Sequence, residues 1–429
     1  MNLRKALFEV VDYVQGSPVT RHLRDIEGML NQNSLPTIQQ LQSELLADLL
    51  NTVVQKTEFY QKHRGWTCLQ DFPVVNKNII RSQFDAINLP IAPKHCVSVK
   101  TSGSTGTPFQ LFQSKDKKAR NTADTLYFSQ KAGFEVGYRL LYLRHWSAYY
   151  KKPGWLAKIQ NVDQLVVEGL TDEFLQSFFK EIIRDTAPKS WLGQGSGFDK
   201  LIAYLERDNS PPLYANIRSI IAISEALYEE TRQKMEYYFG CPVVSRYSNV
   251  ENGIIAQQDI GKSHFTINWA SYIVEILKLD SDLPAPKGEL GRIVVTDLYN
   301  RATPLIRYDT GDLGIMNDSE TCLPVLSRID GRKTDVLTNT AGKVISPFIF
   351  HASLSEYGEI TQVQLIQKEK KYTFRINTSG NTFKKESEFL AHYQQFLGAD
   401  AQISVEYVDE IPVLQSGKRK LIVNEGAEH

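Results

Sequence analysis

The hydrophobic positions of this chain predict an alternation of helices and strands. In residues 36–64, apolar residues from Ile38 to Val53 recur every three or four positions, which is the spacing of a helix. Further helices are predicted at 172–183, 198–205 and 227–239, and buried strands at 219–223 and 242–247. Such strand–helix–strand spacing predicts a largely parallel sheet that is covered by helices.

The pattern changes in the last third of the chain. From Gly288 onwards it predicts short β segments, including 291–297 and 305–308. After about residue 332 the pattern predicts a separate unit, with strands at 372–377 and 403–408 and a helix at 384–397. The predicted fold class is therefore α/β, with a large N-terminal domain (1–331) and a small C-terminal α+β lid (332–429).

One short segment, residues 101–108, is chemically unusual. It reads Thr-Ser-Gly-Ser-Thr-Gly-Thr-Pro, and alternating apolar and polar residues flank it at 97–100 and 109–111. The flanks predict two strands, so the segment is expected at the tip of a hairpin. Glycines allow close approach of the backbone to a ligand, and backbone N–H groups with hydroxyls form a donor surface for phosphate oxygens. A flexible Ser/Thr/Gly linker is the alternative interpretation.

A hairpin tip does not suit two other nucleotide-binding motifs. A Walker A loop needs Gly-Lys-Ser/Thr at the start of a helix, and a dinucleotide fingerprint also connects a strand to a helix. Neither arrangement is predicted around residues 101–108, so we expect a different mode of phosphate binding.

The composition limits the classes of partner. The 429 residues include 49 Lys plus Arg and 49 Asp plus Glu, so no net field attracts nucleic acid or an anionic membrane. The four cysteines show neither CxxC nor Cys/His ligand spacing, which argues against a disulfide framework and a zinc site. No signal-peptide pattern and no apolar run of membrane-spanning length occurs. We therefore expect a soluble, cytoplasmic protein.

Four further motifs follow the hydroxyl-rich segment in order, at 247–251, 307–312, 331–335 and 412–420. The first ends a predicted strand with an aromatic residue that could stack on a base and a carboxylate that could reach Mg²⁺. The second offers Asp312 after a glycine turn, suited to accepting both ribose hydroxyls. The third lies at the predicted domain junction, and the fourth places Lys418 on a terminal loop.

Together and in this order, these motifs resemble those of the superfamily of acyl-CoA synthetases, peptide-synthetase adenylation domains and luciferases. Within it, the chain is most similar to the phenylacetate–CoA ligase family, especially members from capsular polysaccharide clusters. The resemblance covers about residues 50 to 420, and the stretch 246–258 looks particular to the capsule-cluster branch. It implies a large N-terminal adenylate-forming α/β domain that binds nucleotide and acyl group, and a mobile lid.

The resemblance also implies roles for individual residues. The hydroxyl-rich segment would hold the β- and γ-phosphates through Thr101, Ser102, Gly103, Ser104, Thr105, Gly106 and Thr107. Other nucleotide contacts would come from Tyr247 on the adenine, from Asp312 on the ribose, and from Ser248, Asn249 and Arg328. The implied catalytic residues are Lys418, which bridges acyl carboxylate and α-phosphate, Glu251, which binds Mg²⁺, and Arg332, which contacts ribose or phosphate.

The sequence departs from the family pattern at several positions. Thr107 and Val250 stand where many relatives have Lys and Thr, and Thr334 stands at the junction in place of Asp or Lys. Some relatives carry cysteines after the Tyr…Glu motif, where this chain has glutamines ahead of His264. A metal is therefore not expected there, and His264 is interpreted as an ordinary core or surface residue.

The acyl pocket is less well marked in the sequence. Aromatic residues crowd the segment 146–155, namely Trp146, Tyr149, Tyr150 and Trp155, and a second glycine-rich turn occupies 193–197. Either an acyl-pocket lining or ordinary core with a tight start of a helix accounts for these residues.

By this resemblance, the protein is a ligase that uses ATP and Mg²⁺ to convert a small carboxylic acid into an acyl-adenylate. The acyl group then passes to an acceptor, either the thiol of coenzyme A or an amine such as an amino-sugar in capsule assembly. A homodimer is a candidate assembly. Two alternatives are a transferase that moves AMP itself and a nucleotide-binding protein without catalysis, although the presence of both Lys418 and Glu251 argues against the latter.

Overall fold

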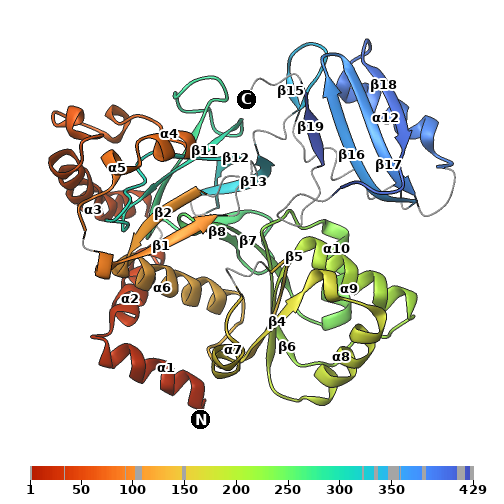
Figure 1. The fold of residues 1–429 in the computed structure, drawn as a ribbon, viewed down its shortest axis with the longest axis horizontal. Coiled ribbons are helices and arrows are strands. Elements are labelled where there is room, and N and C mark those ends of the chain that lie inside the picture. The colour runs from red at the N-terminus through yellow and green to blue at the C-terminus, as the bar shows by residue number, and fades with distance from the viewer. Residues whose placement is uncertain are drawn as a thin grey trace. The chain divides into compact units, whose positions relative to one another are not determined.

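The computed structural model describes residues 2–32, 34–91, 93–101, 109–146, 151–320, 323–332, 337–345, 357, 359–378, 383–412 and 421–425. The described residues form two compact units (Figure 1). The first comprises the chain up to residue 310 together with 314–328, and the second comprises 311–313 and the chain from 329 onwards. The division predicted after residue 331 stays a prediction.

The N-terminal segment is helical. Its helices are α1 (Leu3–Val14), α2 (Pro18–Leu30), α3 (Leu35–Lys56), η1 (Gln61–His63), η2 (Leu69–Asp71), α4 (Lys77–Ser82), α5 (Phe84–Ile87) and η3 (Pro93–His95). The helix predicted over 36–64 corresponds to α3, which ends earlier because Thr57 is extended. Helix α3 packs Leu49 and Val53 into a core that also contains Tyr308.

The predicted hairpin is present. Strands β1 (Cys96–Thr101) and β2 (Phe109–Ser114) pair antiparallel, with Thr101 opposite Phe109. Val99 and Leu111 lie opposite each other on one face and are buried against α3. Because successive residues of a strand point to opposite faces, Ser98 and the residues in step with it point away from this core. Helix α6 (Lys115–Lys131) follows the hairpin directly.

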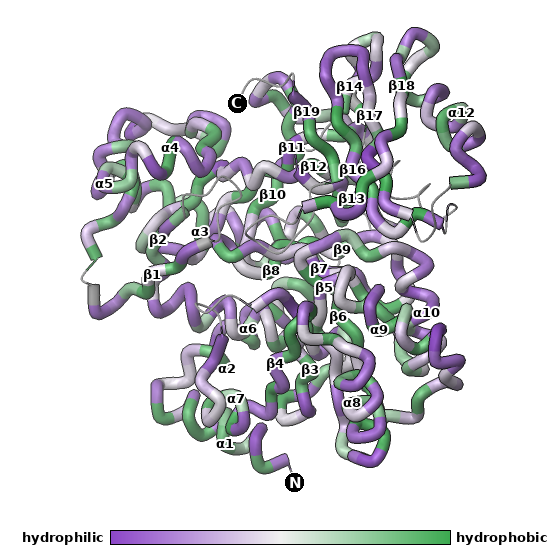
Figure 2. Tube along the Cα trace, turned by 45° about the vertical axis from the view of Figure 1, so that its right-hand side comes forward, coloured by the Kyte–Doolittle hydropathy of each residue, from purple (hydrophilic) through white to green (hydrophobic). Residues whose placement is uncertain are grey.

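The middle of the chain builds the parallel half of an 11-stranded sheet, whose order is β10-β11-β12-β13-β9-β8-β7-β6-β5-β3-β4. The parallel strands are β3 (Arg139–Arg144), β4 (Val162–Val166), β5 (Lys189–Gln194), β6 (Ile217–Ile223) and β7 (Val243–Asn249). The helices between them are α7 (Gly154–Gln160), α8 (Asp172–Arg184), α9 (Gly195–Arg207) and α10 (Glu229–Phe239), with a short η4 (Val167–Gly169). Figure 2 shows the hydrophobic stretches along these central strands.

The predicted elements of this half are confirmed. Helix α8 covers 172–183, and the Thr171 hydroxyl caps it by accepting a hydrogen bond from the N–H of Phe174. Helix α10 ends at Gly240, whose φ of 61° lies in the left-handed region that glycine adopts readily. Trp191 on β5 is fully buried among the apolar faces of the helices, in the core that this half encloses.

The other half of the sheet begins where the chain turns back. Its strands are β8 (Gly253–Gln258), β9 (Phe265–Ile267), β10 (Tyr272–Leu277), β11 (Leu290–Asp297), β12 (Tyr308–Asp318) and β13 (Pro324–Arg332). The pairs β7–β8, β8–β9, β9–β13 and β10–β11 are antiparallel. The expectation of a largely parallel sheet therefore holds only for the strands from β3 to β7.

The strand predicted at 305–308 is wrong for its first three residues. Strand β12 begins only at Tyr308, and Arg307 has a φ of 47°, in the left-handed region. Its buried guanidinium donates to the Phe72 carbonyl oxygen at 3.0 Å and to Glu275 Oε2 at 3.2 Å. These tertiary contacts hold a conformation that the apolar pattern of the segment does not indicate.

The second unit has its own small sheet and core. Its strands are β14 (Leu337–Thr338), β15 (Val344–Ile345), β16 (Ile360–Lys368), β17 (Lys371–Thr378), β18 (Gln402–Tyr407) and β19 (Ile422–Asn424), with helix α12 (Glu386–Leu397). The order β18-β17-β16-β19 combines an antiparallel central pair with parallel outer strands. Phe374, Phe389 and Tyr393 pack together in the core. The three elements predicted for the C-terminal region are confirmed as β17, α12 and β18.

Candidate active site

The candidate site residues Tyr247 to Glu251 lie at the end of β7 and in the turn that follows. The register between β7 and β8 shifts between Tyr247 and Ser248, so the strand ends irregularly here. Asn249 Oδ1 accepts a hydrogen bond from the backbone N–H of Asn252 at 2.7 Å, which closes the turn. An asparagine that bonds its own backbone in this way stabilises a turn. Glu251 is therefore held directly beyond the strand end.

Glu251 is a buried carboxylate with a cationic partner. Its Oε1 lies 2.7 Å from Nζ of Lys77 on α4, and its side chain is 3% exposed while that of Lys77 is 36% exposed. The Tyr308 hydroxyl donates to the same oxygen at 3.1 Å. Since a buried carboxylate is costly without a partner, these two contacts compensate for the burial of the Glu251 side chain.

Gln113 connects this turn to the hairpin. Its buried side chain donates through Nε2 to the carbonyl oxygens of Glu251 at 2.8 Å and of Val250 at 3.3 Å. Lys77 Nζ lies 5.7 Å from the centre of the Phe109 ring, at the first residue of β2. The structure therefore brings Glu251 and Lys77 together with the strand that follows the hydroxyl-rich segment.

A fully buried ion pair supports the turn from behind. Lys117 Nζ on α6 lies 2.8 Å from Asp297 Oδ2, and neither side chain is exposed. Lys117 also donates to the Tyr272 hydroxyl at 2.9 Å, and this hydroxyl donates to the Asn252 carbonyl oxygen. Burial, together with the charge of Asp297, raises the pKa of Tyr272 well above its usual value. The hydroxyl therefore stays protonated and keeps holding the turn.

Breaking this buried pair should destabilise the protein strongly. Lys117→Met leaves the Asp297 carboxylate buried without its cation, so we expect a loss of about 3–5 kcal/mol in the free energy of unfolding. Urea unfolding of the first unit checks this. Lys115→Met, at the exposed start of the same helix, is the matched control and should change the free energy by less than about 0.5 kcal/mol. If Lys117→Met were as stable as the control, the buried pair would not contribute to the stability of the protein.

The remaining nucleotide candidates of this strand are accessible. Tyr247, Ser248 and Asn249 are all half-buried. The Tyr247 hydroxyl donates to Thr310 Oγ1 at 3.3 Å, and the Thr310 hydroxyl donates to the Ile293 carbonyl oxygen at 2.9 Å. These bonds orient the Tyr247 ring while leaving part of its surface available to a ligand.

The predicted ribose and phosphate contacts lie on two neighbouring strands. Asp312 is half-buried on β12, and Arg328 is half-buried on β13. Arg332 is exposed and is the last residue of β13. Asp312 and Arg332 belong to the second compact unit, whereas Arg328 belongs to the first.

Several predicted residues lie outside the described part of the chain. These are residues 102–108 of the hydroxyl-rich segment, Tyr149, Tyr150, Thr334 and Lys418. Thr101, the first residue of the hydroxyl-rich segment, is the last residue of β1. The roles given to all of these residues stay predictions.

Glu251 suits a magnesium ion that is bound mainly by phosphates. Magnesium prefers oxygen ligands and is often held by one or two carboxylates together with substrate phosphates and water. Within the described residues, no cluster of three or more acidic, histidine or cysteine side chains could hold a metal by itself. Both contacts described above reach Oε1 of Glu251. A single carboxylate beside the hairpin that is predicted to bind phosphate therefore fits a metal that would arrive with the nucleotide.

Lys77 is a site residue that sequence reasoning missed. It starts α4, where Asn76 Oδ1 accepts hydrogen bonds from two backbone N–H groups, and its surroundings in the sequence look like an ordinary helix start. Only the folded chain places it beside Glu251, which lies far away in the sequence.

The second glycine-rich turn is explained by packing. It joins β5 to α9, and a Cβ on Gly193 would lie 2.6 Å from the Phe198 ring. A Cβ on Gly197 would lie 2.8 Å from the Leu143 side chain. These glycines let helix and sheet approach closely, which favours the structural interpretation of the turn. Of the described aromatic residues nearby, Trp146 donates to the Leu165 carbonyl oxygen at 2.8 Å, and Trp155 is 66% exposed.

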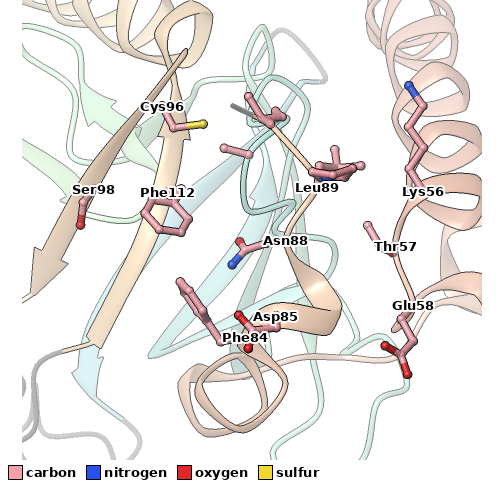
Figure 3. A pocket seen from close by; sticks show the side chains of 13 residues that line it. Lys56, Thr57, Glu58, Phe84, Asp85, Asn88, Leu89, Cys96, Ser98 and Phe112 are labelled. Atoms are coloured by element: carbon pink, nitrogen blue, oxygen red, sulfur yellow. The ribbon is translucent and has the colours of Figure 1, made fainter. Parts of the chain in front are cut away.

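A cavity of about 630 Å³ lies against the opposite face of the hairpin (Figure 3). Ser98 and Phe112, which are cross-strand partners, line it together with Phe84 and Asn88. The Phe84 and Phe112 rings are 5.5 Å apart. None of the predicted site residues that the structure describes lines this cavity, so it is distinct from the Glu251 turn.

Comparison with known proteins agrees with this architecture. Residues 336–425 match the model of the CapK C-terminal domain. The chain is 22% identical to protein CapK of Staphylococcus aureus over 412 residues, which cover 90% of this chain and 89% of CapK. It is 23% identical to phenylacetate-coenzyme A ligase of Pseudomonas putida over 375 residues, which cover 84% of this chain and 77% of the ligase. The chain is a homologue of both proteins.

A solved structure shares the fold across nearly the whole chain. The crystal structure of 2-hydroxyisobutyryl-CoA ligase in the postadenylation state, in complex with R3-HIB-AMP, superimposes with a TM-score of 0.70 and 16% identity. The match covers 90% of this chain and 89% of the ligase. The fold is therefore that of the adenylate-forming acyl-CoA ligases, which confirms the resemblance indicated by the sequence motifs. Across the described helices, none is long and apolar enough to cross a membrane.

Proposed function

We propose that this protein is an ATP-dependent, AMP-forming carboxylate ligase. The observation that carries this proposal is the buried Glu251, held by Lys77 and Tyr308 beside the hairpin whose tip is rich in hydroxyls and glycine. A carboxylate at a phosphate-binding hairpin suits a magnesium nucleotide, and homology to a phenylacetate-coenzyme A ligase supports the reaction class. Fold alone would not assign this chemistry.

The proposed first step joins the acid to AMP. One carboxylate oxygen of the acid attacks the α-phosphorus of ATP, the bond to the β-phosphate breaks, and pyrophosphate leaves. Such phosphoryl-type transfers depend mainly on positioning and on neutralising charge. We assign the β- and γ-phosphates to the segment 101–107, the adenine to Tyr247 and the ribose to Asp312. Mg²⁺, when bound through Glu251, supplies further neutralisation of the phosphate charge.

In this proposal, Lys77 and Lys418 supply two separate positive charges. Lys77 compensates for the absence of a lysine at position 107, because it already lies between Glu251 and the start of β2. Lys418, on the lid proposed for 332–429, bridges the acyl carboxylate and the α-phosphate. An ammonium group serves both positions as a compact point charge.

The second step transfers the acyl group from the adenylate to an acceptor, with loss of AMP. An open conformation of 2-hydroxyisobutyryl-CoA ligase has been solved in complex with 2-HIB-AMP and CoA, and it resembles this chain with a TM-score of 0.60. This supports the thiol of coenzyme A as the acceptor. Homology to CapK makes an amine, such as an amino-sugar in capsule assembly, the second acceptor to test. The proposal includes a homodimer as the assembly.

Carboxylate-dependent exchange of pyrophosphate into ATP tests the reaction class. We expect exchange when a suitable acid from a broad panel is present, and none without acid. Products that carry AMP on a group other than a carboxylate would instead support an AMP transferase. Nucleotide binding without exchange for any acid would support a protein without catalysis.

Asp312→Ala should chiefly weaken ATP binding. A carboxylate that accepts two ribose hydroxyls acts in the ground state and in the transition state alike, so the loss should appear mainly in KM for ATP. We expect an increase of about tenfold, corresponding to one or two hydrogen bonds to a charged group. Steady-state exchange kinetics measure it, with Asp318→Ala at the end of the same strand as the control. An unchanged KM in a folded variant would exclude Asp312 from the site.

A further inference from the structure

A second feature near the proposed site is a buried guanidinium without a carboxylate partner. Arg246 precedes Tyr247 on β7 and is 8% exposed. Its Nε donates to Gln257 Oε1 at 2.8 Å, and its Nη2 donates to Ser129 Oγ on α6 at 3.0 Å. Both partners are neutral, and no ion pair to Arg246 forms within the described part of the chain.

This guanidinium stays charged at neutral pH. Burial lowers the pKa of Arg246 to about 10, which still leaves it protonated at pH 7. A buried charge is costly unless an opposite charge and hydrogen bonds compensate for it. Gln257 and Ser129 supply hydrogen-bond acceptors but no charge. Within the described residues nothing supplies the counter-charge, which a bound anionic ligand would provide.

The position of Arg246 in the sheet suits a ligand contact. The strands β7, β6, β5 and β3 are parallel neighbours, and the last residues of β3, β5 and β6 form one row across the sheet. Arg246 continues this row on β7, three residues before that strand ends at Asn249. This row consists of Arg144, Gln194, Ile223 and Arg246. Gln194 and Ile223 are cross-strand partners. The pairing of β3 with β5 runs up to the residue before Arg144, and that of β6 with β7 runs up to the residue before Arg246, so both arginines continue the row. In open α/β sheets, ligands bind beyond the carboxyl ends of the strands.

A second cation lies in the same row. Arg144 is half-buried, donates to the Tyr142 hydroxyl at 3.2 Å and lies 5.3 Å from the Trp146 ring centre. Burial lowers the pKa of Arg246, and the nearby Tyr142 partly opposes this by raising that pKa. The face on which Tyr142 packs is the one that α6 covers, because Ala132 at the C-terminal end of α6 joins Ile221 and Val244 in one cluster there. Two guanidinium groups thus share one face of the sheet with Tyr142.

We infer that this row binds a second anionic group on the carboxylic acid that the enzyme activates. The inference rests on the proposed function and specifies its substrate class: an acid with an additional carboxylate, phosphate or sulfate. Guanidinium groups bind such groups through paired hydrogen bonds. Because Arg246 and Tyr247 are consecutive on a strand, their side chains leave it on opposite faces. The tail of the acid then lies on the α6 side and the adenine on the other, and the reacting groups meet at the strand end beside Glu251.

Matched acid pairs test this inference. The panel consists of α,ω-dicarboxylic acids of three to eight carbons with their monomethyl esters, and of ω-phosphorylated acids with their dephosphorylated equivalents. In wild-type protein, kcat/KM for ATP–pyrophosphate exchange should be at least about tenfold higher for the best dianionic acid than for its neutral-tailed partner. The two halves of the panel show whether the second group is a carboxylate or a phosphate.

Arg246→Met should remove this preference selectively. We expect kcat/KM for the dianionic acid to fall about 30-fold or more, and that for the neutral-tailed partner to stay within about threefold. Arg246→Lys keeps the charge without the paired geometry. Its kcat/KM for the dianionic acid should therefore lie between the values of wild type and of Arg246→Met. Arg184→Met, at the exposed end of α8, is the control and should change neither value. If Arg246→Met does not fold, the wild-type preference and Arg246→Lys still decide the question.

Three results would overturn the inference. The first is a wild-type preference for neutral-tailed acids, and the second is an equal loss for both members of a pair in Arg246→Met. The third is exchange with no acid at all, which would contradict the proposed function as well. Exchange with neutral-tailed acids alone would contradict only this inference and leave the proposed function in place.

Discussion

Replacing Lys418 with alanine is expected to slow adenylate formation by about 100-fold or more while ATP binding stays nearly unchanged. A charge that bridges the attacking carboxylate and the α-phosphate contributes mainly in the transition state, and removing one such preorganised group typically costs this much. The rate is measured by rapid quench under single-turnover conditions, and ATP binding by equilibrium titration. Because the ground-state contacts to the nucleotide are proposed to come from other residues, rate and affinity should separate.

Lys420→Ala provides a matched control for this experiment, since it removes the same charge two residues away on the same terminal segment. It should retain adenylation within about threefold of wild type. If Lys418→Ala also adenylates within threefold, the assignment of this lysine fails. A parallel loss of ATP affinity and rate would instead make Lys418 a ground-state ligand.

The second large effect concerns the pair of Glu251 and Lys77. Glu251→Gln should slow adenylation by about 100-fold, because it removes the buried carboxylate next to the hairpin that we propose binds phosphate. Its effect on stability should be small, since the Lys77 side chain is 36% exposed and can turn to solvent. Lys77→Met should instead lower the free energy of unfolding clearly, because it leaves the buried Glu251 without its cation.

This asymmetry gives a readout that does not depend on turnover. If Glu251 binds Mg²⁺, then adding MgCl₂ together with a non-hydrolysable ATP analogue should raise the melting temperature of Lys77→Met more than that of wild type. Lys62→Met, in the nearby short helix η1, is the control and should respond as wild type does. Equal magnesium responses in Lys77→Met and Glu251→Gln would show that the metal does not reach this carboxylate.

Local elements of the fold could be predicted well from the sequence. Alternating residues on both sides of a glycine-rich segment predicted the β1–β2 hairpin, and the helices predicted at 172–183 and 227–239 correspond to α8 and α10. The sheet order was less accessible, because residue patterns report burial rather than strand partners. The antiparallel half that begins with β8 was therefore missed. Arg307 shows the same limit, since distant contacts hold its left-handed backbone.

The candidate site could be predicted only as far as local motifs reach. The stretch from Tyr247 to Glu251 was marked by its residue types at a strand end, and the structure places it in a closed turn. Its supporting groups come from distant segments: Lys77 pairs with Glu251, and Gln113 bonds the turn. A contact between two segments that are far apart in the sequence produces no periodic pattern of residues in either segment. Arg246 was likewise visible in the stretch 246–258, but that no described residue supplies its counter-charge appears only in the folded chain.

The fate of a carboxylate oxygen tests the central claim most directly. An acid that supports exchange, labelled with ¹⁸O in its carboxylate, is incubated with the enzyme, ATP and hydroxylamine as the acceptor, and the AMP is analysed by mass spectrometry. Attack of the carboxylate on the α-phosphorus, followed by loss of AMP from the acyl carbon, leaves one ¹⁸O in each AMP released. We predict this stoichiometric label in AMP. AMP without the label, or ¹⁸O in inorganic phosphate instead, would contradict the formation of an acyl-adenylate.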